Sequence, residues 1–306
     1  MILTGDCRAT LRTLPDASVN CVVTSPPYWG LRSYTTDGIG EIGLERTPEE
    51  YVAALVGVFA EAKRVLRDDG TVWLNIGDCY AGSGRGQGDT PHGKQATNKG
   101  TRHVAVPKMA LPAKNLIGIP WRVAFALQAD GWILRRDIIW EKPNPMTEAV
   151  TDRPTSAHEY IFLFSKKGNY WYDAKAIAER AVTAGKNQKA GQNSRANVTQ
   201  TPHGSAPSKA PRREYETRNI RSVWRIATAN SREDHHAMFP DELARRCILA
   251  GCPKDGTVLD PFLGSGTVAI AAERLGRKWI GCELNPKSVA IAKRRIAAPI
   301  QPEIGL

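Results

Sequence analysis

The sequence lacks several features that would place it in whole classes of protein. No apolar run approaches the roughly 20 residues of a membrane-spanning helix, and Met1-Ile2-Leu3 leads directly into polar sequence, unlike a signal peptide. The six cysteines form no C-x-x-C pair, which disfavours zinc and disulfide frameworks. His235 and His236 are adjacent, so they point apart on a strand or helix, and no metal site is expected. We therefore expect a cytoplasmic protein with reduced thiols.

Charge is unevenly distributed along the 306 residues, which carry a formal net charge of +11. Residues 79–115 carry six Lys/Arg and one Asp, a net +5, and residues 180–225 carry ten Lys/Arg and two Glu, a net +8. The remaining chain therefore carries −2. One basic segment could serve solubility alone. A nearly neutral core with two basic inserts instead indicates a polyanionic partner, most simply nucleic acid.

Short apolar strands alternate with amphipathic helices, which predicts an α/β fold. A helix is expected to begin after Thr47, with Pro48 at its first position and Glu50 at its third, and to stop at residues 68–70. It joins two strands in a right-handed, parallel βαβ unit. The expected strands are a short one before Gly5 and residues 19–23, 71–76, 132–140, 160–164, 222–226, 258–260 and 278–283. The other expected helices are residues 9–14, 119–129, 241–250, 268–275 and 286–296.

The stretch CVVTSPPYW, residues 21–29, joins a buried strand to a rigid turn. Pro26 and Pro27 must end the strand, because proline has no N–H for the ladder and a fixed φ. Open α/β sheets bind ligands beyond the carboxyl ends of their strands, so Ser25 and Tyr28 are expected to face a crevice. A lone Pro-Pro dipeptide would favour an ordinary strand-ending turn, but the rest of the chain favours a functional one.

A strand, a glycine turn, a helix and a second strand follow one another near the C-terminus. Asp260 precedes Gly264 and Gly266, which let the backbone turn tightly beside a ligand at a helix N-terminus. Glu283 ends the second strand, where a carboxylate suits ribose hydroxyls. The turn lacks the Lys-Ser/Thr pair of a P-loop, and an anion at position 260 would repel phosphate. These residues favour a nucleoside with a cationic group, and hence S-adenosylmethionine over a pyrophosphate dinucleotide.

Three motifs, TSPPYW followed at a distance by VLDPFLGSGT and WIGCELNP, resemble those of the amino-group DNA methyltransferases of the circularly permuted beta order. The resemblance covers nearly the whole chain outside the basic inserts. It implies a Rossmann-like, S-adenosylmethionine-dependent methyltransferase fold, with a mostly parallel seven-stranded sheet, helices on both faces and a permuted motif order. It implies a catalytic turn of Ser25, Pro26, Pro27 and Tyr28. The cofactor-binding residues that it implies are Asp6, Phe239, Pro240, Asp260, Pro261, Phe262, Gly264, Ser265, Gly266, Thr267, Glu283 and Asn285.

The resemblance also implies one core interrupted by a recognition insert. Residues 1–168 would form the catalytic half, with a basic insert at 81–115, and residues 226–306 the cofactor-binding half. Residues 169–225 would recognise the target. Arginines there are candidates for bidentate bonds to guanine, although phosphate contact is the commoner role for any one of them. The expected DNA contacts are Trp29, Arg32, Arg212, Arg213, Arg218 and Arg221.

The chemistry of amine methylation agrees with these residues. Flipping a base out of the duplex costs a few kcal/mol, and stacking on Tyr28, helped by Trp29, returns roughly 1–3 kcal/mol. The Ser25 hydroxyl and a carbonyl of the proline turn can accept both amine hydrogens and aim the lone pair at the sulfonium methyl. The chain has no Pro-Cys dipeptide of the kind that attacks ring carbons in other cytosine methyltransferases.

The first residue of the catalytic turn bears on the target base. In the resembling family, Asp there usually accompanies N6-adenine methylation and Ser is typical of N4-cytosine methylation, so Ser25 favours cytosine. N6-adenine methylation is the main alternative. RNA methylation is a more remote alternative. Protein-glutamine methylation is disfavoured, because the glutamine enzymes usually carry Asn at this position and lack large basic inserts. A non-catalytic nucleic-acid-binding protein is disfavoured by the retained Ser25, Tyr28, Asp260 and Glu283. The expected partners are double-stranded DNA and a separate cognate restriction endonuclease, with the protein a monomer or homodimer.

Overall fold

The computed structural model describes residues 1–30, 41–82, 111–181, 216–228 and 239–298. The chain divides into two compact units, one made of Met1–Asp173 and Arg221–Leu306 and one made of Ala174–Ile220. The second unit is slightly shorter than the expected insert at 169–225. Its described residues include a two-stranded antiparallel ribbon of β6 (Glu179–Arg180) and β7 (Thr217–Arg218).

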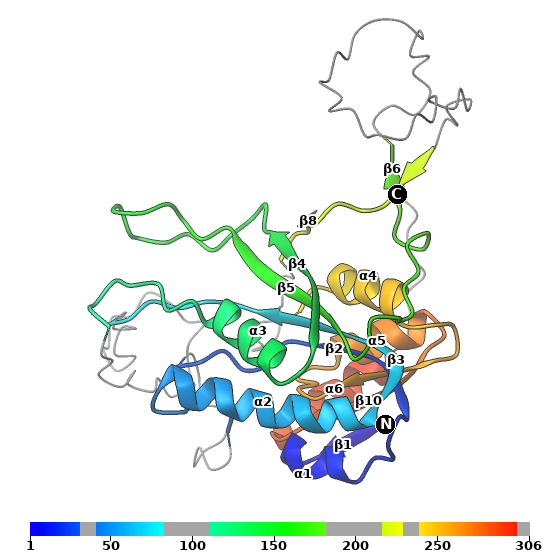
Figure 1. Cartoon of the computed structure of the whole chain (residues 1–306). Helices are drawn as coiled ribbons and strands as arrows, with labels where there is room; N and C mark the ends of the chain where they lie inside the picture. Colours follow the sequence, from blue (N-terminus) through cyan, green and yellow to red (C-terminus); the bar gives the residue numbers. More distant parts are fainter. Residues whose placement is uncertain (31–40, 83–110, 182–215, 229–238, 299–306) are drawn as a thin grey trace, which may run out of the picture. The chain divides into compact units, whose positions relative to one another are not determined.

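An eight-stranded sheet forms the centre of the first unit (Figure 1), in the order β1-β10-β9-β2-β3-β5-β4-β8. Neighbouring strands are parallel except that β5 runs antiparallel to both β3 and β4. The resemblance implied seven strands; β8, which lies within the strand expected at residues 222–226, adds an eighth at the edge beside β4. The strands are β1 (Ile2–Thr4), β2 (Val19–Thr24), β3 (Leu66–Ile76), β4 (Ile133–Glu141), β5 (His158–Ser165), β8 (Val223–Arg225), β9 (Thr257–Asp260) and β10 (Lys278–Glu283).

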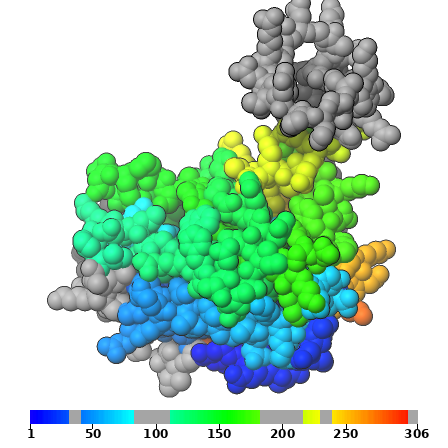
Figure 2. Space-filling model, in the orientation of Figure 1, coloured from blue at the N-terminus to red at the C-terminus, as the bar shows by residue number. Residues whose placement is uncertain are grey.

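Helices cover both faces of this sheet, so the predicted α/β architecture is confirmed. One group packs together beside β3, β4 and β10: α1 (Cys7–Arg12), α2 (Pro48–Val65) and α3 (Ile119–Ala129). The other group is α4 (Asp241–Gly251), α5 (Thr267–Arg274) and α6 (Pro286–Ala297). Figure 2 shows the face that carries α2, in blue, with the green atoms of the following segments beside it. None of the helices in the described ranges is long and apolar enough to cross a bilayer.

The start of β3 differs from the expectation. The helix was expected to stop at residues 68–70, but α2 ends at Val65 and the strand begins at Leu66, directly after it. In the pairing with β2, Val19 lies opposite Leu66 and Cys21 lies opposite Thr71. More residues separate the two β3 positions than the two β2 positions, so the extra β3 residues form a bulge. Gly70 permits the bulge, because a Cβ there would lie 2.5 Å from the Leu66 side chain.

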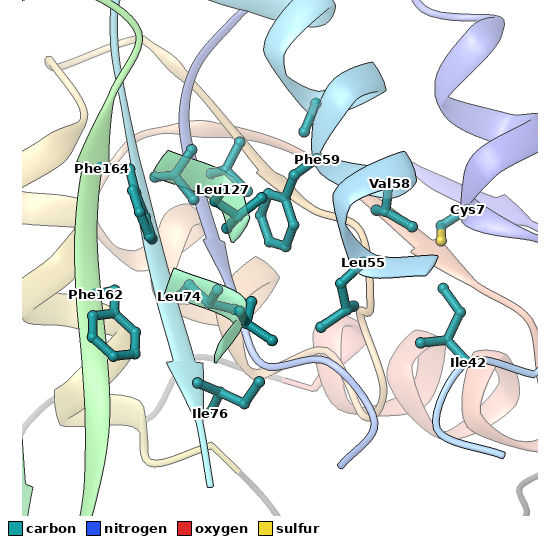
Figure 3. Packing of buried hydrophobic residues seen from close by; sticks show 14 of the residues in the cluster. Cys7, Ile42, Leu55, Val58, Phe59, Leu74, Ile76, Leu127, Phe162 and Phe164 are labelled. Atoms are coloured by element: carbon teal, nitrogen blue, oxygen red, sulfur yellow. The ribbon is translucent and has the colours of Figure 1, made fainter. Parts of the chain in front are cut away.

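Large apolar side chains between the sheet and the first group of helices form the main core (Figure 3). They come from alternate positions of the central strands and from one stripe of each helix. Full burial of each such side chain contributes about 1.5–3 kcal/mol. The core therefore fixes the strands whose ends carry the polar residues described next. Its members include Leu55, Phe59, Leu74, Ile76, Leu127, Phe162 and Phe164.

Candidate active site

Polar side chains gather at one edge of the sheet. Strands β1, β10, β9, β2 and β3 are parallel, so their carboxyl ends share this edge. Asp6, Ser25, Asp260 and Glu283 each lie at or just beyond such an end. Because β5 runs the opposite way, its first residues lie there too, which brings Glu159 beside the predicted site.

The SPPY turn is held from two sides. The Tyr51 hydroxyl, in the first turn of α2, donates to the Pro27 carbonyl at 2.8 Å. On the other side, the Gly30 amide donates to the Gly43 carbonyl at 2.8 Å. Gly43 has φ +103°, and a Cβ there would lie 3.3 Å from the Pro27 side chain. The turn is therefore fixed by its surroundings as well as by its two prolines.

Trp29 does not fit the predicted DNA contact in this structure. Its ring is only 2% exposed and belongs to the main core, together with Ile42. Its Nε1 donates to the Glu45 carbonyl at 2.9 Å. The ring closes the core where residues 41–46 fold back along the turn, so no face of it is presented to a base.

Tyr28 is anchored by its hydroxyl, which donates to Glu159 Oε2 at 2.6 Å and lies 3.2 Å from Asn75 Oδ1. Burial, and then the nearby Glu159 carboxylate, raise the pKa of Tyr28 well above its ordinary value, so the hydroxyl stays a donor. Gly77 makes room for the ring, because a Cβ there would lie 2.6 Å from Tyr28 Cε2. Tyr28 is therefore a rigidly held ring at the sheet edge.

Three residues of this network were not predicted from the sequence. Asn75 Nδ2 donates to Glu159 Oε2 and to the Tyr160 carbonyl, both at 3.1 Å. The Lys142 ammonium forms an ion pair with Glu159 Oε1, and the two side chains are 18% and 15% exposed. The available signals were polar residues at the margins of apolar strands: Asn75 near the end of β3 and Glu159 near the start of β5.

The loop between β9 and α5 turns through two glycines in the left-handed region. Gly264 has φ +54° and Gly266 has φ +85°. A Cβ on Gly266 would lie 3.2 Å from the Ala292 side chain, so this glycine is also needed for packing against α6. Pro261 is buried and Phe262 half-buried at the start of the loop. The tight glycine turn predicted from the sequence is therefore present, and its approach to a ligand stays a prediction.

Asp260 connects this loop to the SPPY turn. Its side chain is 4% exposed, and its Oδ1 accepts from Thr24 Oγ1 at 2.6 Å and from the Phe262 amide at 3.0 Å. Burial raises the pKa of Asp260 to about 7. Because Thr24 immediately precedes Ser25, one hydrogen bond fixes the two predicted halves of the site against each other.

Glu283, at the end of β10, is held by backbone donors. Its Oε2 accepts from the Gly264 amide at 2.8 Å and its Oε1 from the Asn285 amide at 2.7 Å. Burial raises its pKa. Each oxygen keeps a lone pair for a further donor. The carboxyl can therefore accept hydrogen bonds from hydroxyls of a ligand while it holds the Gly264 and Asn285 amides.

Asp6 lies in the neighbouring turn, whose Gly5 amide donates to the Glu283 carbonyl at 2.9 Å. The Asp6 carboxylate caps α1 by accepting from the Arg8 amide at 2.8 Å and pairs with the Arg8 guanidinium at 2.5 Å. The Arg8 guanidinium lowers the pKa of Asp6. This cap starts α1 at Cys7, two residues before the expected start. Contact between Asp6 and an adenine stays a prediction.

Several predicted cofactor residues use their side chains inside the protein. Arg295 Nη1 donates to Ser265 Oγ at 2.5 Å and to Thr267 Oγ1 at 3.4 Å, so both hydroxyls face α6. Asn285 caps α6 by accepting from the Lys287 amide at 2.8 Å. Pro240 is the N-cap of α4 and is preceded by the half-buried Phe239. These side chains therefore have structural partners inside the protein, and their contact with a cofactor stays a prediction.

The predicted DNA-binding arginines fall in three settings. Arg218, in the second unit, forms an ion pair with Glu179 at 2.7 Å. Arg221 is exposed in the first unit. Arg32, Arg212 and Arg213 lie outside the described residues. Among the parts of the chain that the structure describes, no group of three His, Cys, Asp or Glu side chains is placed to hold a metal.

Comparison with known proteins gives concordant matches. The N6/N4 methyltransferase family, described as DNA methylase, matches residues 19–294. The type II methyltransferase M.Cfr9I of Citrobacter freundii is 44% identical over 292 residues, covering 95% of this chain and 86% of that protein. M.SmaI of Serratia marcescens is 43% identical over 297 residues, covering 96% of this chain and 90% of that protein.

Solved structures with the same fold include the cytosine-N4-specific PvuII DNA methyltransferase. It has a TM-score of 0.66 at 19% identity and covers 99% of this chain and 88% of that one. A putative DNA modification methylase from Thermus thermophilus, complexed with S-adenosyl-L-methionine, has a TM-score of 0.57 at 25% identity. That match covers 97% of this chain and 94% of the other.

Proposed function

The chain belongs to the N6/N4 DNA methylase family, and we propose that it is a type II methyltransferase that methylates N4 of a cytosine flipped out of double-stranded DNA. The hydrogen bond between Thr24 and Asp260 carries the proposal. It fixes the turn that would hold the target amine against the loop that would hold the methyl donor. Methyl transfer needs this kind of alignment, because its catalysis is mostly positioning and electrostatics.

S-adenosylmethionine is the cofactor of this family. The residues present fit it: the Glu283 carboxyl has lone pairs for the ribose hydroxyls, and Gly264 lets the loop backbone approach. Asp260 is a buried acid that a cationic ligand would ionise, because a nearby positive charge lowers the pKa of a carboxyl. When bound, the cofactor supplies a methyl group on a positively charged sulfur.

The SPPY turn would present the target amine. We assign the two acceptors of its hydrogens to Ser25 Oγ and the Pro26 carbonyl, since the Pro27 carbonyl already accepts from Tyr51. Tyr28 would stack on the flipped base. With the cofactor bound, the amine nitrogen would bond to the methyl carbon as the carbon–sulfur bond broke, and the nitrogen would release one proton to water. No covalent bond to the protein is required.

Cytosine is preferred over adenine because Ser25 stands at the first position of the turn. The structural neighbour named as cytosine-N4-specific supports this choice. Adenine N6 is the second candidate, since its amine could make the same two hydrogen bonds. The type II names of the relatives support a separate restriction endonuclease as a partner. The protein itself would act in the cytoplasm as a monomer or homodimer.

DNA contact is assigned to the two basic inserts. In residues 169–225, Arg218 and Arg221 are candidates, together with Arg212 and Arg213. Arg32, four residues after Tyr28 in the sequence, is a further candidate. Most of these arginines would contact phosphate, which positions the duplex without reading its sequence. Those that reach guanine in the major groove would set the recognition sequence.

The proposed reaction is tested by incubating the protein with unmethylated DNA and methyl-labelled cofactor, and identifying the labelled nucleoside by mass spectrometry after digestion. We expect N4-methyldeoxycytidine. Labelled N6-methyldeoxyadenosine would replace the cytosine assignment with the adenine one, and label in neither nucleoside would contradict DNA amine methylation.

The division of roles is tested with Ser25→Ala and Tyr28→Ala. Loss of a positioned acceptor in Ser25→Ala, or of the stacking ring in Tyr28→Ala, should lower the single-turnover rate by about 10²-fold to 10³-fold. Calorimetric affinity for the cofactor should stay near the wild-type value, because Glu283 and Asp260 are unchanged. Parallel loss of affinity and rate would contradict the separate roles of turn and loop.

A further inference from the structure

Lys142 and Glu159 form a half-hidden ion pair at the same sheet edge as the SPPY turn. The pair joins the end of β4 to the start of β5, and the Lys142 amide also donates to the Ala157 carbonyl at 2.8 Å. Glu159 uses its second oxygen to accept from Tyr28 and Asn75. The Lys142 ammonium is therefore two hydrogen bonds away from the ring proposed to stack on the flipped base.

The ammonium has hydrogen-bonding capacity to spare. It carries three N–H donors, and within the described residues Glu159 Oε1 is its one carboxylate partner. Its Nζ also lies 4.5 Å from the centre of the Trp140 ring, which stabilises the cation on one side. The side chain keeps 18% of its surface exposed, so it is not sealed inside the protein.

We propose that Lys142 is a base-recognition residue that donates to the ring nitrogen beside the amino-bearing carbon of the flipped base. This nitrogen is N3 in cytosine and N1 in adenine, and it is an acceptor in both. The proposal rests on the function proposed above but not on the choice of base. Ser25 and Pro26 would hold the amine hydrogens, and Lys142 would fix the rotation of the ring in its plane.

Pairing with Glu159 suits this role electrostatically. Positive charge moves from sulfur to the amine nitrogen during methyl transfer, and an isolated ammonium beside that nitrogen would oppose the reaction. The ion pair keeps the donor while making its surroundings neutral overall. Glu159 is thus a positioning residue with two partners, Lys142 and Tyr28.

The test compares wild type and Lys142→Met on two DNA duplexes, one with the normal target base and one with an analogue. Once the modified base is known, it is replaced in a duplex by its deaza analogue, 3-deazacytosine or 1-deazaadenine, which lacks the ring acceptor. On the normal duplex, Lys142→Met should lower kcat/KM by about ten- to a hundredfold, as expected for a lost hydrogen bond to a charged group. On the deaza duplex, kcat/KM of the wild type should already be reduced, because the ring acceptor is missing. Lys142→Met should reduce kcat/KM on that duplex no further.

Lys166→Met is the matched control. Lys166 is 21% exposed and pairs with Asp68 at 3.2 Å, but it follows the opposite end of β5. It should keep wild-type kcat/KM on both duplexes. Calorimetric affinity for the cofactor should be unchanged in both lysine variants. The double variant Lys142→Met, Glu159→Gln removes both charges but keeps a side-chain oxygen that can accept the hydrogen bond from the Tyr28 hydroxyl. It replaces Lys142→Met if the single variant is unstable.

Equal fractional losses on the two duplexes, or wild-type kcat/KM in the Lys142 variants, would overturn the proposal. A loss of rate matched by a loss of cofactor affinity would also overturn it, since that pattern indicates a structural role. A wild-type protein that methylates no DNA base would instead overturn the proposed function.

Discussion

Asp260 is a single side chain with two tasks in the site. Its carboxyl is buried at the start of the glycine loop between β9 and α5 and accepts from Thr24 in the strand that leads to Ser25. Burial raises its pKa to about 7, and the neighbouring Glu283 contributes in the same direction. A group with this pKa changes charge near neutral pH, so its effects can be separated from those of ordinary carboxylates.

Stability should depend on pH through Asp260. Its folded pKa of about 7 lies above the ordinary 3.8, so the folded state binds the proton more tightly than the unfolded state. The stabilisation is fully present below the ordinary value and is lost as pH rises through about 7. The free energy of unfolding of wild type, relative to Asp260→Asn, should therefore fall from about pH 4 to about pH 8. Chemical denaturation of both proteins measures this, and a constant difference would contradict the assigned pKa.

Cofactor affinity should show the opposite trend. An ionised Asp260 attracts a cationic ligand, so wild-type affinity should rise as pH increases through about 7. Asp260→Asn should bind more weakly and lack this rise, and titration of the ligand itself cancels in the comparison. Calorimetry across the pH range decides the point; equal affinities in the two proteins would remove Asp260 from the cofactor site.

Gly77 should be intolerant of even one added carbon. A Cβ there would lie 2.6 Å from the Tyr28 ring, so Gly77→Ala must displace that ring. Methyl transfer should fall by about tenfold or more, as small misplacements of reacting groups have large effects. Gly168→Ala is the control, because no atom lies within 4 Å of its Cβ. Equal rates in the two variants would show that the Tyr28 position does not matter.

Helix α2 supports the site as an element, through its first turn. Thr47 Oγ1 accepts from the Glu50 amide at 3.1 Å, which fixes where the helix starts. Tyr51 follows one turn later, and its hydroxyl reaches the Pro27 carbonyl. The capping sequence thus sets the position of a residue that holds the SPPY turn.

Tyr51→Phe should therefore act on transfer and not on cofactor binding. Removing one hydrogen bond costs about 0.5–1.5 kcal/mol, or a rate loss of about two- to tenfold if the turn relaxes by that amount. Tyr170→Phe is the control. The Tyr170 hydroxyl accepts a hydrogen bond from Arg135, near the start of β4, whereas the site lies at the end of that strand. A Tyr51→Phe enzyme with a wild-type single-turnover rate would mean that the prolines alone hold the turn.

Local sequence patterns predicted most helices and strands, because helix periodicity, helix caps and strand-ending prolines depend only on residues close together in the sequence. They failed where distant segments decide. The bulge at Gly70 depends on pairing with β2, and the burial of Trp29 depends on residues 41–46 folding back over it. Glu159 joins the site only because β5 runs antiparallel beside β3, and a sequence pattern around Glu159 does not show that direction.

At the scale of the whole molecule, charge separates the core from its inserts. Residues 180–225 carry a net +8 on a chain whose total is +11. Ion pairing with phosphates releases counterions, so such a segment should make DNA affinity strongly dependent on salt.

Deleting residues 186–213, which contain six Lys/Arg, should weaken DNA binding and flatten its salt dependence. The slope of log affinity against log salt should fall by about 0.9 for each phosphate that the shortened protein no longer neutralises. Replacing the six Lys/Arg residues by Gln removes the charges without shortening the chain, and so controls for the change in length. An unchanged slope in both variants would make the insert a passive loop.

The most direct test of the central claim is to express the protein in a bacterial host without DNA methyltransferases and to map base modifications by single-molecule sequencing of the host genome. Wild type should place N4-methylcytosine at one recurring sequence, and Ser25→Ala should leave that sequence unmodified. N6-methyladenine at a recurring sequence, or an unmodified genome with wild type, would contradict the account.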